Sequence, residues 1–339
     1  MNCKLWSMDN NAEISRKMGV NCGQLGNNLP SPSRSIVLIK SLKAGHVKHA
    51  NPDILNALEG TNIQVSIMVP NQLISNISSS QSLANEWVRT NNVPFYPKTL
   101  THYLLVGNEI FSFSSNQDRQ TWYGLVQAMS RLKYSLKIHN IRNIKIGTTI
   151  AMDVLQSSFP PSNGMFRSDI SIPVMKPLLQ FLNRTKSYSF LDAYPNFPWS
   201  GDPTNINLDY AFLKGNQTYT NLLDQMLDSV IFAMTKLGFP NVRLVIAETG
   251  WPNARDVDQI GANIFNTATY NRNLIRRMTS KLAIGTPAHP NVVIPTFIFA
   301  LYNENQKGGP GTERHWGLLN SDGTSVYEVD LTEKRPKFD

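Results

Sequence analysis

The sequence is poor in cysteine and in charged residues, and it has no long hydrophobic run. Its 339 residues include two cysteines, too few for a disulfide scaffold or for most structural zinc sites. The charged fraction is 17%, and no apolar run reaches the roughly 18 residues that a membrane-spanning helix needs. The 20 glycines and 20 prolines are ordinary numbers, which excludes fibrous and low-complexity classes. The hydrophobic fraction of 41% therefore predicts a globular protein with a large core.

The basic residues are in excess but are not gathered into a binding motif. The chain has 32 lysines and arginines against 24 aspartates and glutamates, which gives a net charge of +8. This balance permits an anionic partner. Because the basic residues form neither a long block nor an arginine-rich arm, we expect no nucleic-acid partner.

Several common catalytic motifs are also absent. The six histidines show no HExxH or similar close spacing, so we expect no zinc site. No GxSxG elbow indicates a serine hydrolase, and no GxxxxGK[ST] loop indicates a nucleotide. The sequence therefore gives no indication of zinc, serine-hydrolase or nucleotide-dependent chemistry.

The first 17 residues are polar and include Asp9 and Glu13 without any apolar stretch. We interpret residues 1–17 as an N-terminal extension and not as a secretory signal peptide. Three Asn-X-Ser/Thr triplets are a weak indication of the opposite, a secreted chain, and they begin at Asn76, Asn183 and Asn216.

Eight short runs rich in β-branched and other apolar residues recur along the chain. Most are continuous and do not alternate with polar residues, which is typical of strands buried on both faces of a parallel sheet. The predicted strands are Met18–Asn21, His46–His49, Gln64–Pro70, His102–Glu109, Ile144–Met152, Tyr188–Pro195, Arg243–Trp251 and Ile294–Tyr302.

Helical patterns lie between these runs. Apolar residues spaced three and four apart predict helices over Pro32–Lys43, Gln117–Lys137, Leu222–Leu237 and Asn263–Met278. Strand and helix alternating eight times predict a (β/α)₈ TIM barrel of the α/β class in a single domain over residues 18–331. A doubly wound sheet is the alternative, but no glycine-rich turn follows the first strand. Residues 332–339 are interpreted as a charged C-terminal tail.

Two glutamates follow predicted strands directly. Glu109 ends the fourth strand and Glu248 lies at the end of the seventh, and the carboxyl ends of barrel strands form the usual active-site face. Two opposed carboxyl groups, one protonated and one ionised, are what glycoside hydrolysis requires. The alternative for each is an ordinary strand-end residue paired with a lysine or arginine.

Aromatic and charged residues accompany this pair. Flat rings near strand ends suit the apolar faces of sugars, and the candidates are Tyr194, Phe197, Trp199, Trp251, Tyr302 and Trp316. Of these we expect Trp316 to pack a loop onto the barrel. Glu304, Lys307 and Glu313 follow the eighth strand and form either part of a cleft or a surface ion-pair network. Cys22 is expected to be a small buried apolar side chain.

Seven sequence motifs follow one another along the chain, and their order carries information as well as their residues. They are GVNCGQLGNNLPSP (Gly19–Pro32), ANPDIL (Ala50–Leu55), IMVPN (Ile67–Asn71), WVRTNNVPFYP (Trp87–Pro97), VGNE (Val106–Glu109), ETGWPN (Glu248–Asn253) and NENQKGGPGTERHWGLL (Asn303–Leu319). In these motifs the chain resembles the plant endo-1,3-β-glucanases of glycoside hydrolase family 17. The segments SLKAGHVK (Ser41–Lys48), SSFPPSNG (Ser157–Gly164) and NLLDQMLDSV (Asn221–Val230) resemble the anther-type members most.

The resemblance implies a (β/α)₈ barrel that hydrolyses internal β-1,3-glucosidic bonds of callose-type glucans with retention. It implies that Glu109 is the proton donor and Glu248 the nucleophile, and that Asn108 holds the hydroxyl next to the reacting carbon. Further substrate-binding candidates are Tyr194, Phe197, Trp251, Glu304, Lys307 and Glu313. It also implies a monomer without metal or cofactor and an extracellular or cell-wall location.

The chain departs from the family pattern in four places. Cys22 replaces a tyrosine, and the stretch Val47–Pro52 lacks two residues, a Tyr-Asp pair among them. Asn216–Asn221 is about nine residues shorter than usual, and residues 1–17 stand in place of a signal peptide. The shortened second strand puts substrate binding on that side of the cleft in question, and one alternative is therefore a glucan-binding barrel with impaired catalysis. A second alternative is a glucanosyl transferase that uses the same two carboxylates. We expect the barrel to close nevertheless, with the adjustment taken up at Ala50–Pro52.

Overall fold

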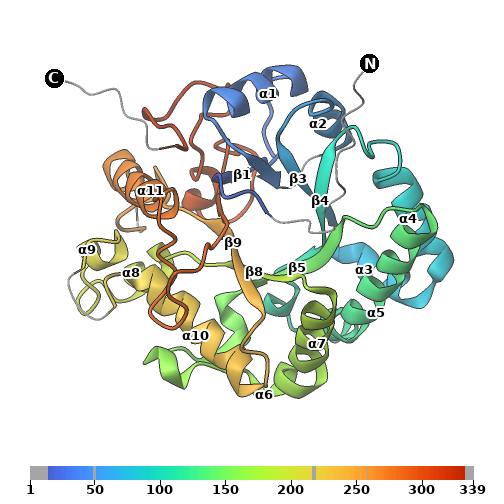
Figure 1. Cartoon of the computed structure of the whole chain (residues 1–339). Helices are drawn as coiled ribbons and strands as arrows, with labels where there is room; N and C mark the ends of the chain where they lie inside the picture. The colour runs from blue at the N-terminus through green and yellow to red at the C-terminus, as the bar shows by residue number, and fades with distance from the viewer. Residues whose placement is uncertain (1–13, 49–50, 216–218, 258, 333–339) are drawn as a thin grey trace.

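A closed parallel barrel forms the centre of the molecule, with helices around it (Figure 1). The structure is a computed structural model, and it describes residues 14–48, 51–215, 219–257 and 259–332. The barrel strands are β1 (Gly19–Asn21), β2 (His46–Lys48), β3 (Gln64–Val69), β4 (Leu100–Asn108), β5 (Lys145–Ala151), β8 (Tyr188–Asp192), β9 (Arg243–Thr249) and β10 (Thr296–Ile298).

The eight strands follow one another around the barrel in chain order, and β1 pairs with β10 to close it. Every pairing between neighbouring barrel strands is parallel. The (β/α)₈ fold and all eight predicted strands are confirmed. A short antiparallel hairpin, β6 (Leu155–Ser157) with β7 (Met165–Phe166), interrupts the alternation and was not predicted.

Most strands, β4 excepted, are shorter than their apolar runs, because the last residues of several runs leave the ladder. The run Ile294–Tyr302 contributes only Thr296–Ile298 to the barrel. Beyond this point Ala300 and Leu301 exchange backbone hydrogen bonds with residues 316–319. The ends of the runs therefore form loops on the active-site face and not further barrel strand.

Helices cover the outside of the barrel (Figure 1). The longer ones are α1 (Pro32–Ser41), α4 (Gln81–Asn91), α5 (Asn116–Ile138), α7 (Lys176–Thr185), α10 (Leu222–Lys236) and α11 (Ile264–Met278). Shorter ones are α2 (Pro52–Ala57), α3 (Ile74–Ser79), α6 (Ser168–Ile170), α8 (Asn196–Gly201) and α9 (Leu208–Ala211). The four predicted helices correspond to α1, α5, α10 and α11.

Helix starts follow local side-chain chemistry. Ser31 caps α1 by accepting a hydrogen bond from the backbone N–H of Arg34, with Pro32 at the first helical position. Ser115 and Asp118 form a reciprocal capping box at the start of α5. These caps fix where each helix leaves the loop that connects it to the preceding strand.

The barrel interior is filled by large side chains below the mouth. Their buried cluster consists of Ile14, Tyr103, Leu105, Tyr188, Phe190, Val245, Ala247 and Phe297. Ile14 belongs to the segment interpreted as an extension, yet it is 6% exposed and packs within this cluster. Residues 1–13 and 333–339, most of the predicted extension and tail, lie outside the described residues.

The shortened second strand still completes the barrel. His46, Val47 and Lys48 pair in register with β1 on one side and with β3 on the other. Asn51 caps α2, which starts at Pro52. The prediction that the barrel closes is confirmed, while residues 49 and 50 of the predicted strand and loop lie outside the described residues.

In the described part of the chain, no helix combines the length and apolarity needed to cross a membrane.

Gly250 provides a test of the packing between β9 and the end of β10. A Cβ atom at this position would lie 2.4 Å from the backbone carbonyl oxygen of Phe299, which cannot move aside as a flexible side chain could. We predict that Gly250→Ala lowers the free energy of unfolding by about 1–3 kcal/mol, as overpacking does. Urea denaturation measures this loss.

Gly201→Ala is the matched control, because no atom lies within 4 Å of its Cβ position. Equal stability of the two variants would contradict the packing account.

Candidate active site

A cleft of about 730 Å³ opens at the carboxyl ends of the barrel strands. Its lining comes from segments far apart in the sequence, and it consists of Asn21, Gly23, Gln24, Leu25, Asn51, Asn108, Glu109, Tyr194, Phe197, Glu248, Phe299, Glu304, Lys307, Glu313 and Trp316. The parallel barrel gathers these residues because all its strands end on the same face. Of the nine sequence-predicted site residues, eight line this cleft and Trp251 does not.

Glu109 is presented by a tightly held turn at the end of β4. Asn71 binds the backbone of Asn108 on both sides, since its Oδ1 accepts from the Asn108 N–H at 2.8 Å and its Nδ2 donates to the Asn108 carbonyl at 2.9 Å. Glu109 itself has a left-handed backbone with φ of 48°, a conformation that is strained for a residue with a side chain. Its N–H donates to the Thr149 carbonyl at 3.1 Å. The backbone geometry thus holds Glu109 toward the cleft at an energetic cost.

The environment of Glu109 favours its protonated form. Burial is the main cause and the nearby Glu248 carboxylate adds to it, while Lys48 and Lys307 act in the opposite direction. Together they raise the pKa of Glu109 from 4.5 to about 7. Below that pH Glu109 can donate a proton.

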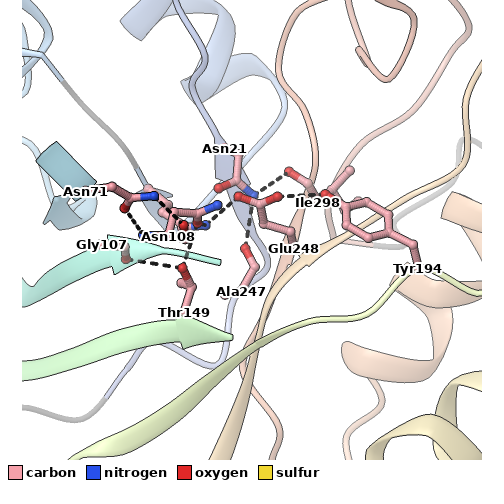
Figure 2. Close-up of polar contacts among 10 residues, drawn as sticks. Asn21, Asn71, Gly107, Asn108, Thr149, Tyr194, Ala247, Glu248 and Ile298 are labelled. Atoms are coloured by element: carbon pink, nitrogen blue, oxygen red, sulfur yellow. Dashed lines mark hydrogen bonds and ion pairs between the residues drawn. The ribbon is translucent and has the colours of Figure 1, made fainter. Parts of the chain in front are cut away.

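Glu248 is held by a cation and a phenol, one on each carboxylate oxygen. Lys48 Nζ lies 2.6 Å from Oε1, and the Tyr194 hydroxyl donates to Oε2 at 2.7 Å. Figure 2 shows Tyr194 and Glu248 joined by the second bond. Burial, together with the charges of Glu248 and Asp192, raises the pKa of Tyr194 well above 10, so the phenol remains a donor. Both contacts stabilise an ionised Glu248.

Asn108 lies between the two glutamates. Its side-chain Oδ1 accepts a hydrogen bond from the Thr149 hydroxyl at 2.7 Å (Figure 2). The same oxygen accepts a longer hydrogen bond from Lys48 Nζ at 3.5 Å. Because protein donors use Oδ1, the amide nitrogen is the atom left to donate to a substrate hydroxyl.

Aromatic rings form one wall of the cleft. Tyr194, Phe197 and Trp316 pack against each other with ring centroids 5.0–5.8 Å apart. Phe299 packs against Trp316 and was not singled out from the sequence. Trp316 was expected only to pack a loop, but the structure places it in this wall as well.

The charged residues after β10 form another side of the cleft. Lys307 pairs with Glu313 at 2.9 Å, and its ammonium lies 4.5 Å from the centre of the Phe299 ring. Glu304 is 5% exposed and accepts a hydrogen bond from the Leu25 N–H at 2.9 Å. Of the two alternatives for these residues, the structure favours part of a cleft.

Three of the aromatic candidates do not line the cleft, and they are Trp199, Trp251 and Tyr302. Trp251 is fully buried, donates its ring N–H to the Gly261 carbonyl and packs between Trp199 and Phe212. Tyr302 is 1% exposed and bonds Ser35. These rings support the loops from beneath. Cys22 is buried as expected, and burial raises the pKa of its thiol to about 12.

The sequence reasoning missed two buried charged groups at the centre of the site. Lys48 is the last residue of β2 and Asp192 the last of β8, and their exposures are 0% and 2%. A charged residue inside a run that is otherwise buried on both faces was the available signal. It indicates either a buried ion pair or a functional group.

Comparison with known proteins agrees with this geometry. The family described as "Glycosyl hydrolases family 17" matches residues 18–331. The chain is 55% identical over 335 residues to the probable glucan endo-1,3-beta-glucosidase A6 of Arabidopsis thaliana, covering 96% of this chain and 70% of that protein. It is 38% identical to glucan endo-1,3-beta-glucosidase 11 of the same plant, covering 92% and 75%.

A solved structure of a similar protein agrees with these sequence matches. CJP38, a beta-1,3-glucanase and allergen of Cryptomeria japonica pollen, superposes with a TM-score of 0.88 at 39% identity, over 94% of this chain and 100% of that one. The match of the family over residues 18–331, the relatives and the shared barrel lead to one conclusion: the chain belongs to glycosyl hydrolases family 17.

Proposed function

We propose that this protein is a retaining endo-hydrolase of β-1,3-glucosidic bonds in callose-type β-glucan. Relatives named glucan endo-1,3-beta-glucosidases support the substrate class. The observation that carries the proposal is the contrast between two glutamates in one cleft. The surroundings of Glu109 favour its proton, whereas Glu248 faces a lysine ammonium and a phenol.

In the first step Glu109 acts as general acid. It protonates the oxygen of the scissile bond while Glu248 attacks the anomeric carbon, so the leaving sugar departs with the proton and a glycosyl-enzyme ester forms. In the second step Glu109, now ionised, takes a proton from water, and the resulting hydroxide displaces Glu248 from the anomeric carbon. Two inversions restore the original configuration.

The remaining cleft residues suit a sugar chain. The ring wall around Tyr194, Phe197 and Trp316 offers flat apolar surface to pyranose faces. The free amide nitrogen of Asn108 is available for the hydroxyl beside the reacting carbon. Glu304, Lys307 and Glu313 offer hydrogen bonds to further hydroxyls, and Trp251 contributes from below by supporting its loop.

We further propose an extracellular, cell-wall location and action as a monomer. Asn76 and Asn183, which begin two of the Asn-X-Ser/Thr triplets, are exposed and accessible to glycosylation. The third, at Asn216, lies outside the described residues. One chain supplies Asn108, Glu109 and Glu248 to a single cleft, which supports action as a monomer.

Digestion of laminarin separates the proposed activity from its two alternatives. An endo-hydrolase produces shorter oligomers, a glucanosyl transferase also produces longer ones, and a binding barrel leaves the glucan unchanged. We expect shorter oligomers to dominate from the earliest times, and chromatography of the products measures this. A product set without shorter oligomers would contradict the proposal.

The two glutamates are distinguished by a trapping experiment. We predict that Glu109→Gln lowers kcat on laminarin by about 10²–10⁴-fold but spares aryl glucosides whose leaving group needs no protonation. On such a substrate the variant accumulates a covalent intermediate, because the base for its hydrolysis is missing. Mass spectrometry locates the sugar on Glu248, and Glu248→Gln forms no adduct. An adduct on another residue would assign the roles differently.

The raised pKa of Glu109 also predicts a dependence of stability on pH. The unfolded chain releases this proton near pH 4.5 and the folded protein near 7, so across that interval the folded state binds more protons. Stability from this group is therefore lost as the pH rises through the interval, by about 3 kcal/mol at most. Glu109→Gln should raise the melting temperature at about pH 8 and leave it unchanged at about pH 4.

Glu86→Gln, at an exposed position on α4, is the control and should change neither temperature. Equal effects of Glu109→Gln at both pH values would argue against a buried, protonated Glu109.

A further inference from the structure

Lys48 occupies the centre of the active site without facing the solvent. Its side chain is 0% exposed, and its ammonium contacts Glu248 Oε1 at 2.6 Å and Asn108 Oδ1 at 3.5 Å. Lys48 therefore contacts two residues, Glu248 and Asn108, that have roles in the proposed reaction. It lies on β2, a strand on which the sequence analysis identified no site residue.

The charges that face this ammonium come from three other parts of the barrel. They are Glu248 on β9, Asp192 at the end of β8 and Glu109 after β4, while the Tyr194 phenol lies beside Glu248. Burial alone lowers the pKa of Lys48, but these carboxyl groups, Glu248 foremost, reverse the effect and hold it above 10.5. Lys48 is therefore a permanent cation in the barrel mouth.

The three acids are not equivalent partners for this single cation. Neither carboxyl oxygen of Asp192 has a hydrogen-bond partner among the described residues, and burial foremost raises its pKa well above 3.8. Glu109 also favours its proton. Glu248 is the acid that touches the ammonium directly, so the cation pairs with Glu248, whereas burial favours the protonated form of the other two acids.

We propose that Lys48 is a positioning residue that keeps Glu248 ionised and holds it, together with Tyr194, in the orientation for attack. The inference rests on the proposed function and deepens it, because it explains which of three neighbouring acids becomes the nucleophile. Lys48 binds Oε1 and Tyr194 binds Oε2, so the carboxylate is fixed at both ends. Contact with Asn108 couples the same cation to the residue beside the general acid.

The experiment compares Lys48→Met with the wild type over a range of pH. Removing the cation makes protonation of Glu248 easier, so the acid limb of the kcat/KM profile should move upward by about one pH unit or more, a tenfold or larger change in proton affinity. The loss of activity in Lys48→Met should appear mainly as a lower kcat and not as a higher KM. Lys48→Arg keeps the charge and should return the limb toward its original position.

Two controls make the result specific. Lys98→Met removes a lysine from an exposed ion pair with Glu59, 3.0 Å long, and should leave the profile in place. Asp192→Asn removes the acid whose carboxyl oxygens lack hydrogen-bond partners among the described residues, and the proposal predicts that it does not move the acid limb. A shift in that limb for Asp192→Asn would show that Asp192 is charged and would overturn the assignment.

A spectroscopic measurement on the wild-type protein covers the case in which Lys48→Met does not fold. With ¹³C-labelled glutamate, the side-chain carboxyl signal that disappears in Glu248→Gln belongs to Glu248. At about pH 5 this signal should have the chemical shift of a carboxylate, although an acid buried without a cation would be protonated there. A protonated signal would overturn the proposal.

The outcomes also separate this inference from the proposed function. If Glu248→Gln retains full laminarin hydrolysis, the proposed function fails, whereas the carboxyl signal still reports whether Lys48 keeps Glu248 ionised. If Glu248→Gln is inactive but Lys48→Met keeps the wild-type pH profile, the function stands and the role of Lys48 is wrong.

Discussion

A single buried ion pair, between the Lys48 ammonium and the Glu248 carboxylate 2.6 Å away, determines the charge arrangement of the active site. Three acids, Glu248, Asp192 and Glu109, act on the Lys48 ammonium, and burial makes ionisation of each of them costly. One cation compensates one of these acids. Burial raises the pKa of the others, Glu109 and Asp192, and so favours their protonated forms. In the mechanism we propose, the difference between acid and nucleophile follows from which carboxyl group the lysine touches.

The barrel supplies the geometry for this arrangement. Parallel strands end on one face, so β2, β4, β8 and β9 deliver Lys48, Glu109, Asp192 and Glu248 to the same place without any local sequence relation. Rigidity comes from the surrounding bonds. Asn71 fixes the turn at the end of β4, and Asn21 ties β1 to β9 and β10 through the carbonyls of Ala247 and Ile298 (Figure 2). The shortened second strand still brings Lys48 to the site, and the role that we propose for β2 depends on this residue.

Much of this could be predicted from the sequence, for identifiable reasons. Continuous β-branched runs revealed eight buried strands, and the rule that barrel sites lie at strand ends then selected Glu109 and Glu248. The rule does not say which way a side chain turns. Trp251 and Trp316 both lie near strand ends, yet the first packs beneath its loop and the second lines the cleft. Lys48 was missed because its importance depends on three strands packed around it, which no local pattern records.

The central claim, that an ionised Glu248 attacks while Glu109 protonates, is tested most directly by the configuration of the first product. Proton NMR of laminarin during the first turnovers, before mutarotation, distinguishes the two anomers at the new reducing end. The account predicts the β-anomer, because attack by Glu248 followed by water inverts the carbon twice. Initial release of the α-anomer would mean that water attacks directly, and it would contradict the role assigned to Glu248.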